Sequence, residues 1–263
     1  MKIAGIIIAR NEEKDILNCI KSLEFCDEVI LVDNESTDKT ASVAKKLGAK
    51  IFEYKKLAND GNFADIRNFA LTKTKCDWVI YLDADETITP ELKDEILNKL
   101  PDAKENAFVI ARRNFIFNKE FHHSGQYPDY VKRIFRKSEF KNWTGELHEE
   151  PNYLYEGKLT QGNGSTIGYL ENPMIHKKKI TISQMVEKTN KWSEIEAKLM
   201  IEAHHPPMTL PRFFSAMARE FWKRIIVQMA FLDGAEGIIY AIYQVFSKFT
   251  SYAKLYEMQV KEK

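Results

Sequence analysis

Apolar and polar positions alternate along the first hundred residues with two different periods. Short continuous apolar runs, typical of strands buried on both faces, are separated by segments in which apolar residues recur as on one face of a helix. The runs that predict strands cover residues 3–8, 28–32, 50–54 and 77–82, and the segments that predict helices cover 12–25, the stretch between 38 and 48, 64–71 and 90–100. Thr89 is the expected N-cap of the last helix. This order predicts an α/β fold, a mostly parallel sheet flanked by helices.

The pattern changes after residue 106. Short β-like runs at 108–112, 131–136 and 166–170 are joined by long irregular stretches rich in His, Trp, Tyr and Gly, and long loops in a compact domain usually carry function. Beyond His176, helical periodicity covers residues 182–204, 212–231 and 235–256, with a hinge at Asp233 and Gly234. We therefore expect one domain over residues 1–180 and a helical extension over residues 181–263.

Composition narrows the class of protein. With 44% hydrophobic and 29% charged residues, the chain is expected to be globular. Cys19, Cys26 and Cys76 have neither CxxC nor metal-ligand spacing, so we expect reduced, structural thiols. The N-terminal apolar run is too short for a signal peptide, and no run reaches the roughly 18 residues of a spanning helix. We therefore expect the site to face the cytoplasm.

Polar residues gather where the predicted strands end. Asn11 and Glu12 follow the first strand, Asp33 follows the second, and Asp83 and Asp85 follow the fourth. Ligands of such sheets bind beyond the carboxyl ends of the strands. Two carboxylates two residues apart leave the same face of a strand, where they could grip Mg²⁺ or Mn²⁺ together with a diphosphate. Each of these residues could equally cap a helix or end a strand, but together they indicate a nucleotide site.

The order of four motifs resembles the GT-A glycosyltransferases of family 2. They are Ile7–Glu13, Val32–Asp38, Ala64–Asn68 and Leu82–Glu86, and the resemblance covers roughly residues 1–180. Four further motifs are similar to the bacterial lipopolysaccharide core glucosyltransferase subgroup: Tyr127–Tyr130, Arg133–Arg136, Trp143–Glu149 and Leu232–Gly237. The resemblance implies a Rossmann-like GT-A domain with a nucleotide-binding half (1–105) and an acceptor half (106–180). It also implies an inverting, metal-dependent hexosyltransferase that takes a UDP-sugar, or a GDP-sugar, and a lipid-linked or lipopolysaccharide-core glycan.

Roles follow for the matched positions. Asp33 would recognise the base, Asp83 would lie near the ribose and the metal, and Asp85 would bind the metal, with His176 as a candidate third ligand. Arg67 could meet phosphate or orient an aspartate. The residues expected to bind the donor are Ala9, Arg10, Asn11, Glu12, Asp33, Arg67, Asp83 and Ala84, and those expected to bind Mn²⁺ or Mg²⁺ are Asp85, Asp83 and His176.

An inverting displacement needs a carboxylate base opposite the leaving nucleoside diphosphate. The position that matches the family is Glu149, which His148 could orient, and Asp129 and Glu146 are its rivals. Arg133 and Arg136 alternate with apolar neighbours, so we expect them to share a strand face and to contact the diphosphate or an anionic acceptor.

The C-terminal part of the chain is basic and amphipathic. Residues 177–263 hold 14 basic and 9 acidic residues, whereas residues 1–176 hold 25 and 29. Aromatic and basic residues interleave from Arg212 onward. Such helices can lie on the cytoplasmic face of the inner membrane, pack on the first domain or form a homodimer seam, and the sequence leaves the three alternatives open.

Other functions fit the sequence less well. A sugar nucleotidylyltransferase would need a Gly-rich basic loop where Ala9–Glu12 stands, and a dehydrogenase would need GxGxxG there. The aromatic residues of the tail follow helical spacing and not that of a stacking platform, so we expect no nucleic-acid partner. A catalytically decayed, membrane-associated scaffold is the remaining alternative, against which the intact Asp83, Asp85 and Glu149 weigh.

Overall fold

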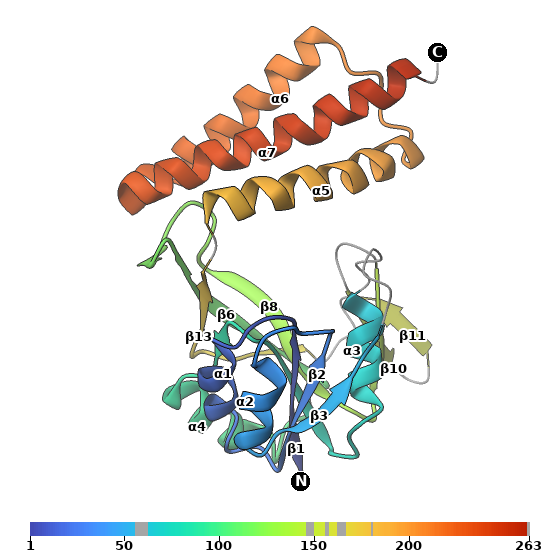
Figure 1. The fold of residues 1–263 in the computed structure, drawn as a ribbon, viewed down its shortest axis with the longest axis vertical. Helices are drawn as coiled ribbons and strands as arrows, with labels where there is room; N and C mark the ends of the chain where they lie inside the picture. The colour runs from blue at the N-terminus through green and yellow to red at the C-terminus, as the bar shows by residue number, and fades with distance from the viewer. Residues whose placement is uncertain (56–62, 146–149, 156–157, 162–166, 180, 262–263) are drawn as a thin grey trace. The chain divides into compact units, whose positions relative to one another are not determined.

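A computed structural model of the chain describes residues 1–55, 63–145, 150–155, 158–161, 167–179 and 181–261 (Figure 1). They form two compact units. The first consists of Met1–Arg112 and Tyr130–His176, and the second of Arg113–Asp129 and Lys177–Lys263. Residues 113–129, which we expected in the acceptor half of the first domain, thus belong with the helices of the second unit.

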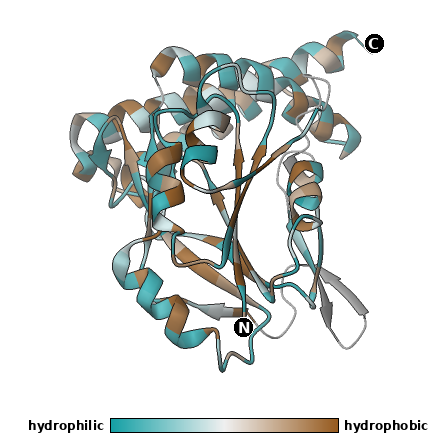
Figure 2. Cartoon of the chain, turned by 60° about the horizontal axis from the view of Figure 1, so that its bottom comes forward, coloured by the Kyte–Doolittle hydropathy of each residue, from teal (hydrophilic) through white to brown (hydrophobic). Residues whose placement is uncertain are grey.

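Parallel strands form the centre of the first unit. β1 (Ile3–Ala9) lies between β2 (Glu28–Asp33) and β4 (Trp78–Asp83), and β3 (Lys50–Glu53) pairs with β2. The continuous apolar runs produce these strands because helices cover both faces of the sheet and bury every second side chain on each side. Figure 2 shows the central strands as largely hydrophobic along their length. The expected α/β fold with a parallel sheet is confirmed.

The sheet continues on the other side of β4, where β8 pairs with β4 in the antiparallel direction. In the described part of the chain the order continues through β8 (Asp129–Arg136), β6 (Ala107–Ile116), β13 (Met174–Lys178) and β5 (Glu86–Thr87). β12 (Ile167–Tyr169) and β7 (Lys119–Glu120) also pair with β6, and a separate antiparallel sheet is formed by β9 (Phe140–Thr144), β10 (Glu150–Tyr155) and β11 (Lys158–Gln161).

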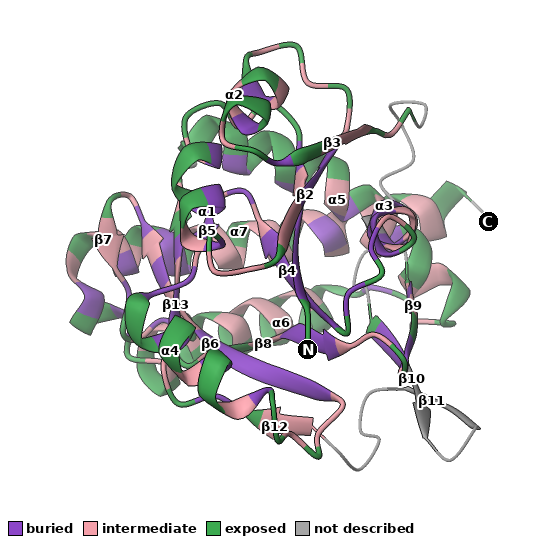
Figure 3. Ribbon diagram, turned by 90° about the horizontal axis from the view of Figure 1, so that it is seen from below, coloured by how far each residue is buried: buried purple, intermediate pink, exposed green. Residues whose placement is uncertain are grey.

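Helices cover the two faces of the parallel strands. On one face, α1 (Ile16–Ser22), α2 (Thr40–Lys46) and α4 (Pro90–Lys99) contribute buried residues to one cluster, and on the other face α3 (Phe63–Leu71) packs with β9. Figure 3 colours the buried residues purple, and they include parts of these helices and of the strands between them. The predicted N-cap of α4 is confirmed, because the hydroxyl of Thr89 accepts a hydrogen bond from Leu92 N at 3.2 Å.

The boundaries of α1 and β6 differ from the prediction. α1 begins at Ile16 and not at Glu12: the residues before it form a turn in which the backbone oxygen of Glu12 accepts from the N–H groups of Asp15 and Ile16. β6 continues to Ile116, beyond the predicted end at Arg112. Arg112 and Arg113 ended the apolar pattern, yet each is accommodated in the strand by a carboxylate partner, Glu86 and Glu120 respectively.

The second unit contains α5 (Ile182–Glu202), α6 (Leu210–Trp222) and α7 (Gly234–Lys261), which confirms the helical extension. Thr181 and Gln184 form a capping box at the start of α5. α6 ends nine residues before the predicted residue 231. A π-helical turn follows at Lys223–Val227, and Met229 has a left-handed backbone with φ 48°, so the α-helix cannot continue to the hinge.

Candidate functional site

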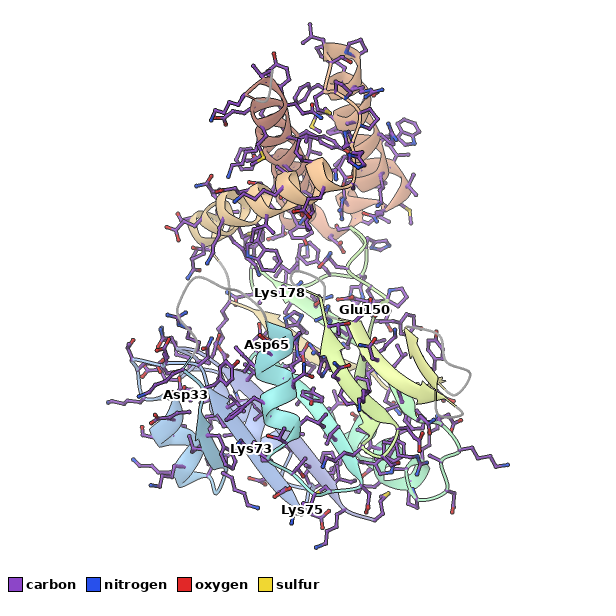
Figure 4. All side chains as sticks on the ribbon, turned by 90° about the vertical axis from the view of Figure 1, so that its right-hand side faces the viewer. Asp33, Asp65, Lys73, Lys75, Glu150 and Lys178 are labelled. Carbon is purple, nitrogen blue, oxygen red and sulfur yellow. The ribbon has the colours of Figure 1, made fainter. Side chains whose placement is uncertain are left out.

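The strand register brings the expected polar residues to one edge of the sheet. Ala9 pairs with Asp33, and Ile8 pairs with both Val32 and Asp83, so β1, β2 and β4 end at the same level. In Figure 4, Asp33 and Asp65 lie toward this edge, whereas Lys73 and Lys75 lie toward the opposite one. The parallel arrangement alone therefore gathers side chains that are up to 74 positions apart in the chain, from Ala9 to Asp83.

Asn11 joins the loop after β1 to the loop after β2. Its backbone N–H donates to Ser36 Oγ at 2.9 Å, and its side-chain Oδ1 accepts from Thr37 N at 2.8 Å. Its φ of 58° lies in the left-handed region that asparagine tolerates. Arg10, beside it, is exposed. The two loops thus form one hydrogen-bonded rim, in which Asn11 holds the backbone and Arg10 faces solvent.

Asp33 has a carboxylate oxygen that lacks a partner within the described structure. The residue is only 7% exposed, and Oδ2 accepts from Ser36 N at 3.3 Å, whereas Oδ1 is buried and has no hydrogen-bond partner among the described residues. A buried acceptor left unsatisfied is costly, so such an atom is a candidate for contact with a ligand donor. An N–H group of a nucleobase would supply that donor.

Asp83 is held by two guanidinium groups. Its Oδ2 accepts from Arg133 Nη2 at 2.6 Å, and its Oδ1 accepts from Arg67 Nη2 at 3.3 Å. The side chain keeps 39% of its surface exposed, so it still faces the open edge of the sheet. Loss of water around Asp83 disfavours its charged form and would raise its pKa. The charges of Arg133 and then Arg67 outweigh this effect and hold the pKa of the carboxyl well below the ordinary value.

A second carboxylate, Glu86, lies beneath Asp83 and is completely buried. Its Oε1 accepts from Arg133 Nη2 at 2.6 Å and from Arg112 Nη1 at 3.1 Å, and its Oε2 accepts from the backbone N–H of Asp83 at 3.0 Å. Arg133 thus bridges Glu86 and Asp83 with one nitrogen. Glu86 and Arg112 were not among the residues singled out from the sequence, although Glu86 stands directly after the Asp83–Asp85 motif.

Arg133 and Arg136 do not share a strand face, and that prediction was wrong. They lie three residues apart on β8, and side chains alternate with a period of two. Arg136 donates instead to the backbone oxygens of Ala103 and Glu105 and lies over the ring of Trp78. Arg136 therefore stabilises the region where β4 begins, and only Arg133 belongs to the site.

Asp85 and His176 form the most direct candidate for a cation site. His176 Nε2 lies 3.3 Å from Asp85 Oδ2, because β13 pairs with β5 and places His176 opposite Glu86. Two ligands in adjacent positions of an octahedral cation at about 2.1 Å would be about 3.0 Å apart, so the pair fits Mg²⁺ or Mn²⁺. Within the described residues, no group of three or more His, Cys, Asp or Glu side chains is placed to hold one ion. The remaining ligands would therefore come from the diphosphate and from water.

Apolar and aromatic residues lie next to the polar residues of the site. Ala9 and Ala84 are buried, and the buried thiol of Cys19 lies 3.5 Å from the backbone oxygen of Asp83. Burial raises the pKa of the Cys19 thiol, so it remains neutral there. On the other face, the guanidinium of Arg67 lies 5.1 Å from the ring centre of Trp143. This stacking fixes the guanidinium that reaches Asp83.

Asn68 ties α3 to β9. Its Nδ2 donates to Trp143 O at 2.9 Å, and its Oδ1 accepts from Trp143 N at 2.7 Å. The side-chain amide of Asn68 thereby satisfies both backbone polar groups of Trp143, as a neighbouring strand would, and holds β9 beside α3.

The candidates for the base are only partly described. Glu149, His148 and Glu146 lie outside the described residues. Asp129 belongs to the second unit, where its carboxylate accepts from Asn114 Nδ2 at 2.9 Å. Glu12, expected in the nucleotide pocket, is half-buried and donates its backbone N–H to Thr40.

Comparisons with known proteins agree on the family. The family model described as glycosyl transferase family 2 matches residues 6–155. An uncharacterized glycosyltransferase of Rickettsia bellii (strain RML369-C) is 28% identical over 263 residues, which cover 98% of this chain and 87% of the relative. The lipopolysaccharide core biosynthesis glycosyltransferase LpsC of Rhizobium meliloti (strain 1021) is 25% identical over 272 residues, which cover 98% of this chain and 93% of LpsC.

Among solved structures, S. aureus TarS 1-349 in complex with UDP-GlcNAc superposes with a TM-score of 0.51 at 16% identity, over 98% of this chain and 89% of that one. This likeness concerns the fold. The sheet order, the motifs at its carboxyl edge and the family match lead to the same conclusion: the chain belongs to glycosyl transferase family 2 and has a GT-A fold with a C-terminal helical extension.

Proposed function

We propose that this chain is an inverting glycosyltransferase that moves a sugar from a UDP-sugar to a lipid-linked glycan such as a lipopolysaccharide core. The observation that carries the proposal is the buried Oδ1 of Asp33, which has no hydrogen-bond partner among the described residues and lies on the same sheet edge as the Asp85–His176 pair. The first fits the N–H of a uracil, and the second fits a cation that binds a diphosphate. TarS was crystallised with UDP-GlcNAc, and LpsC acts in lipopolysaccharide core biosynthesis, which supports the donor and acceptor classes. A GDP-sugar is the alternative donor.

Each donor-side residue has a distinct task in this proposal. Asp33 accepts from the base. Asp83, kept ionised by Arg67 and Arg133, can accept hydrogen bonds from the ribose hydroxyls, because both its oxygens keep lone pairs. Asp85 and His176 would hold Mn²⁺ or Mg²⁺. When bound, the cation supplies positive charge to the departing diphosphate.

The transfer is a single displacement. The acceptor hydroxyl oxygen forms a bond to the anomeric carbon while the bond from that carbon to the diphosphate oxygen breaks, and the configuration inverts. The proton of the hydroxyl passes to a carboxylate base, for which we propose Glu149, with His148 orienting it. Asp129 and Glu146 are the rival bases.

Calorimetric titration of UDP and of GDP, with Mn²⁺ or with a chelator, tests the donor site. We expect UDP to bind in the presence of Mn²⁺. Asp85→Ala should weaken this binding by more than about 100-fold, since losing even an outer-shell partner of a metal site costs 10–100-fold. The matched control is Asp94→Ala, which removes an exposed carboxylate on α4. Unchanged UDP binding by Asp85→Ala contradicts the cation site, and absence of binding by the unmodified protein indicates the inactive-scaffold alternative.

A second experiment identifies the base. Glu149→Gln should leave UDP affinity unchanged and lower the transfer rate by about 10²–10⁴-fold, the usual contribution of a positioned base. The assay measures UDP released from UDP-glucose or UDP-GlcNAc with purified lipopolysaccharide core as acceptor. Asp129→Asn and Glu146→Gln are compared in parallel. If Glu149→Gln transfers normally and one of the others does not, the base lies at that position.

A further inference from the structure

α6 buries none of its residues within the described structure. Its large apolar side chains gather on one side, with Leu210, Phe214 and Phe221 spaced by four and seven positions and Trp222 next to them. Phe214 is 73% exposed and Trp222 is 61% exposed. Figure 3 accordingly draws α6 without a buried segment. α5, in contrast, buries Met185 and Ala197 against the rest of the unit.

α7 carries a second exposed apolar stripe. It is separate from the side that buries Tyr240 and Leu255. Its members recur at spacings of three, four or seven positions, which place them on one side of the helix. They are Ile239, Ile242, Phe246, Phe249, Tyr256 and Val260. Phe213 of α6 packs against Phe249 and Tyr256 of this stripe, with ring centres 6.1 and 6.2 Å apart.

Phe213, next to Phe214 in α6, thus joins α6 to the stripe of α7, and we call the exposed members of the two stripes together the apolar face. Its members are Leu210, Phe214, Phe221, Trp222, Ile239, Ile242, Phe246, Phe249, Tyr256 and Val260. Single exposed apolar residues are normal on a soluble protein, but exposed stripes of large apolar residues on two helices that pack together indicate an interaction site.

Charge indicates the chemistry of the partner. Residues 210–227 contain four basic side chains, Arg212, Arg219, Lys223 and Arg224, and one acidic side chain, Glu220. Arg212, Arg219 and Lys223 are exposed, and their spacing of seven and four positions aligns them along α6. An anionic surface complements this excess of positive charge, whereas a second copy of the chain carries the same excess.

We propose that the apolar face lies in the interfacial layer of an anionic lipid bilayer, with the basic residues of α6 at the headgroups. Among the described helices, none is long and apolar enough to span a membrane alone; Leu210–Val227 and Ala230–Lys261 meet the criterion only as a pair bent by 60°. Insertion along the plane of the bilayer suits two adjoining amphipathic helices. The inference extends the proposed function, because a lipid-linked acceptor is presented at such a surface.

Vesicle co-sedimentation of the full-length protein tests this. The probes are vesicles of phosphatidylcholine alone and of phosphatidylcholine with phosphatidylglycerol. We expect binding to the anionic vesicles that weakens at high salt. Phe214→Ser with Trp222→Ser should lower the partition coefficient at least about 10-fold, since each large apolar side chain contributes that much when buried. Arg219→Gln with Lys223→Gln should lower it by about 30-fold on anionic vesicles only, at roughly fivefold per basic residue.

The matched control is Tyr169→Ser, which removes an aromatic side chain of the first unit that is 62% exposed. Its partitioning should equal that of the unmodified protein. Thermal unfolding verifies that every variant is folded. The proposal is overturned if the folded protein stays in the supernatant, if the Phe214 and Trp222 variant binds like the control, or if light scattering shows a dimer that this variant dissociates. UDP binding in vesicle-free solution reports on the donor site separately, so either proposal can fail without the other.

Discussion

The two units are each organised around a buried carboxylate, but they satisfy it in opposite ways. In the first unit, Glu86 accepts from the guanidinium groups of Arg133 and Arg112. In the second unit, Asp233 accepts from the backbone N–H groups of His122 and His123 and from the hydroxyl of Ser124, at 2.7 to 3.2 Å. Glu86 is balanced by two guanidinium charges, whereas Asp233 is balanced mainly by N–H and O–H dipoles, with the imidazole Nδ1 of His123 3.5 Å from its Oδ1.

The difference suits what each region must hold. A guanidinium can form ion pairs with two carboxylates at once, so Arg133, held by the buried Glu86, fixes both the position and the ionisation of Asp83 at the open sheet edge. Backbone N–H groups instead fix the path of a chain, so Asp233 shapes the loop at residues 122–124. Lys119 Nζ adds a bond to the backbone oxygen of Asp233 at 2.6 Å. The guanidinium network therefore keeps Asp83 ionised for binding a ligand, whereas the bonds to Asp233 hold the backbone of residues 122–124 in place.

The largest expected effect comes from breaking the charge network. Arg133→Gln leaves the buried Glu86 with Arg112 and removes one guanidinium from Asp83, so the free energy of unfolding should fall by about 3–5 kcal/mol. UDP affinity should fall as well, because Asp83 loses the group that positions it. Urea denaturation measures the first effect and calorimetry the second.

The control for this variant is the bidentate pair of Arg113 with Glu120, whose side chains are 38% and 20% exposed. Arg113→Gln should cost less than about 1 kcal/mol, as pairs open to solvent do. Equal losses in the two variants would mean that burial does not distinguish the two pairs.

The sequence found the residues whose position follows from local pattern. Asp33, Asp83 and Asp85 were predicted to lie together because a continuous apolar run marks a buried strand, and parallel strands end at one edge. Glu86 was missed although it is adjacent to Asp85, because its partner Arg133 is 47 positions away and only the antiparallel pairing of β4 with β8 brings the two together. An acidic residue after a strand looks the same in sequence whether it is exposed or buried.

The same limit applies to Asp233. Its place in a hinge was predicted from the neighbouring glycine, and φ of 72° at Gly234 agrees with that turn. Its hydrogen bonds to residues about 110 positions earlier could not be predicted, because the residues around Asp233 do not indicate which distant loop it contacts. Likewise, Met229 has a left-handed backbone after the π-helical turn that follows α6, and no adjacent glycine or proline in the sequence predicts this conformation.

A smaller effect is expected from the dipole-balanced carboxylate. Asp233→Asn retains one acceptor oxygen and replaces the other with an N–H₂ group, which cannot accept from His123 or Ser124. The free energy of unfolding should fall by about 1–3 kcal/mol, and hydrogen exchange should quicken at the backbone N–H groups of residues 122–124. Asp77→Asn is the control, because Asp77 also accepts from a backbone N–H, that of Lys2, but at the surface. Faster exchange spread evenly over α5 and α7 would contradict a local role.

The smallest expected effect, and the one that distinguishes charge from geometry most directly, is the pH dependence of Asp83. Arg133 and Arg67 lower its pKa in the folded protein, so its contribution to stability is fully present above the unfolded pKa of about 3.9 and is lost as the pH falls below that value toward the folded pKa. The difference in the free energy of unfolding between the unmodified protein and Asp83→Asn should therefore be constant from about pH 7 to pH 5 and should shrink below about pH 4. Urea denaturation across this range measures it. A difference that stays constant into acid would mean that Asp83 contributes through its hydrogen bonds alone, and the guanidinium groups around Asp83 and Glu86 would then act through geometry, as the N–H groups around Asp233 do.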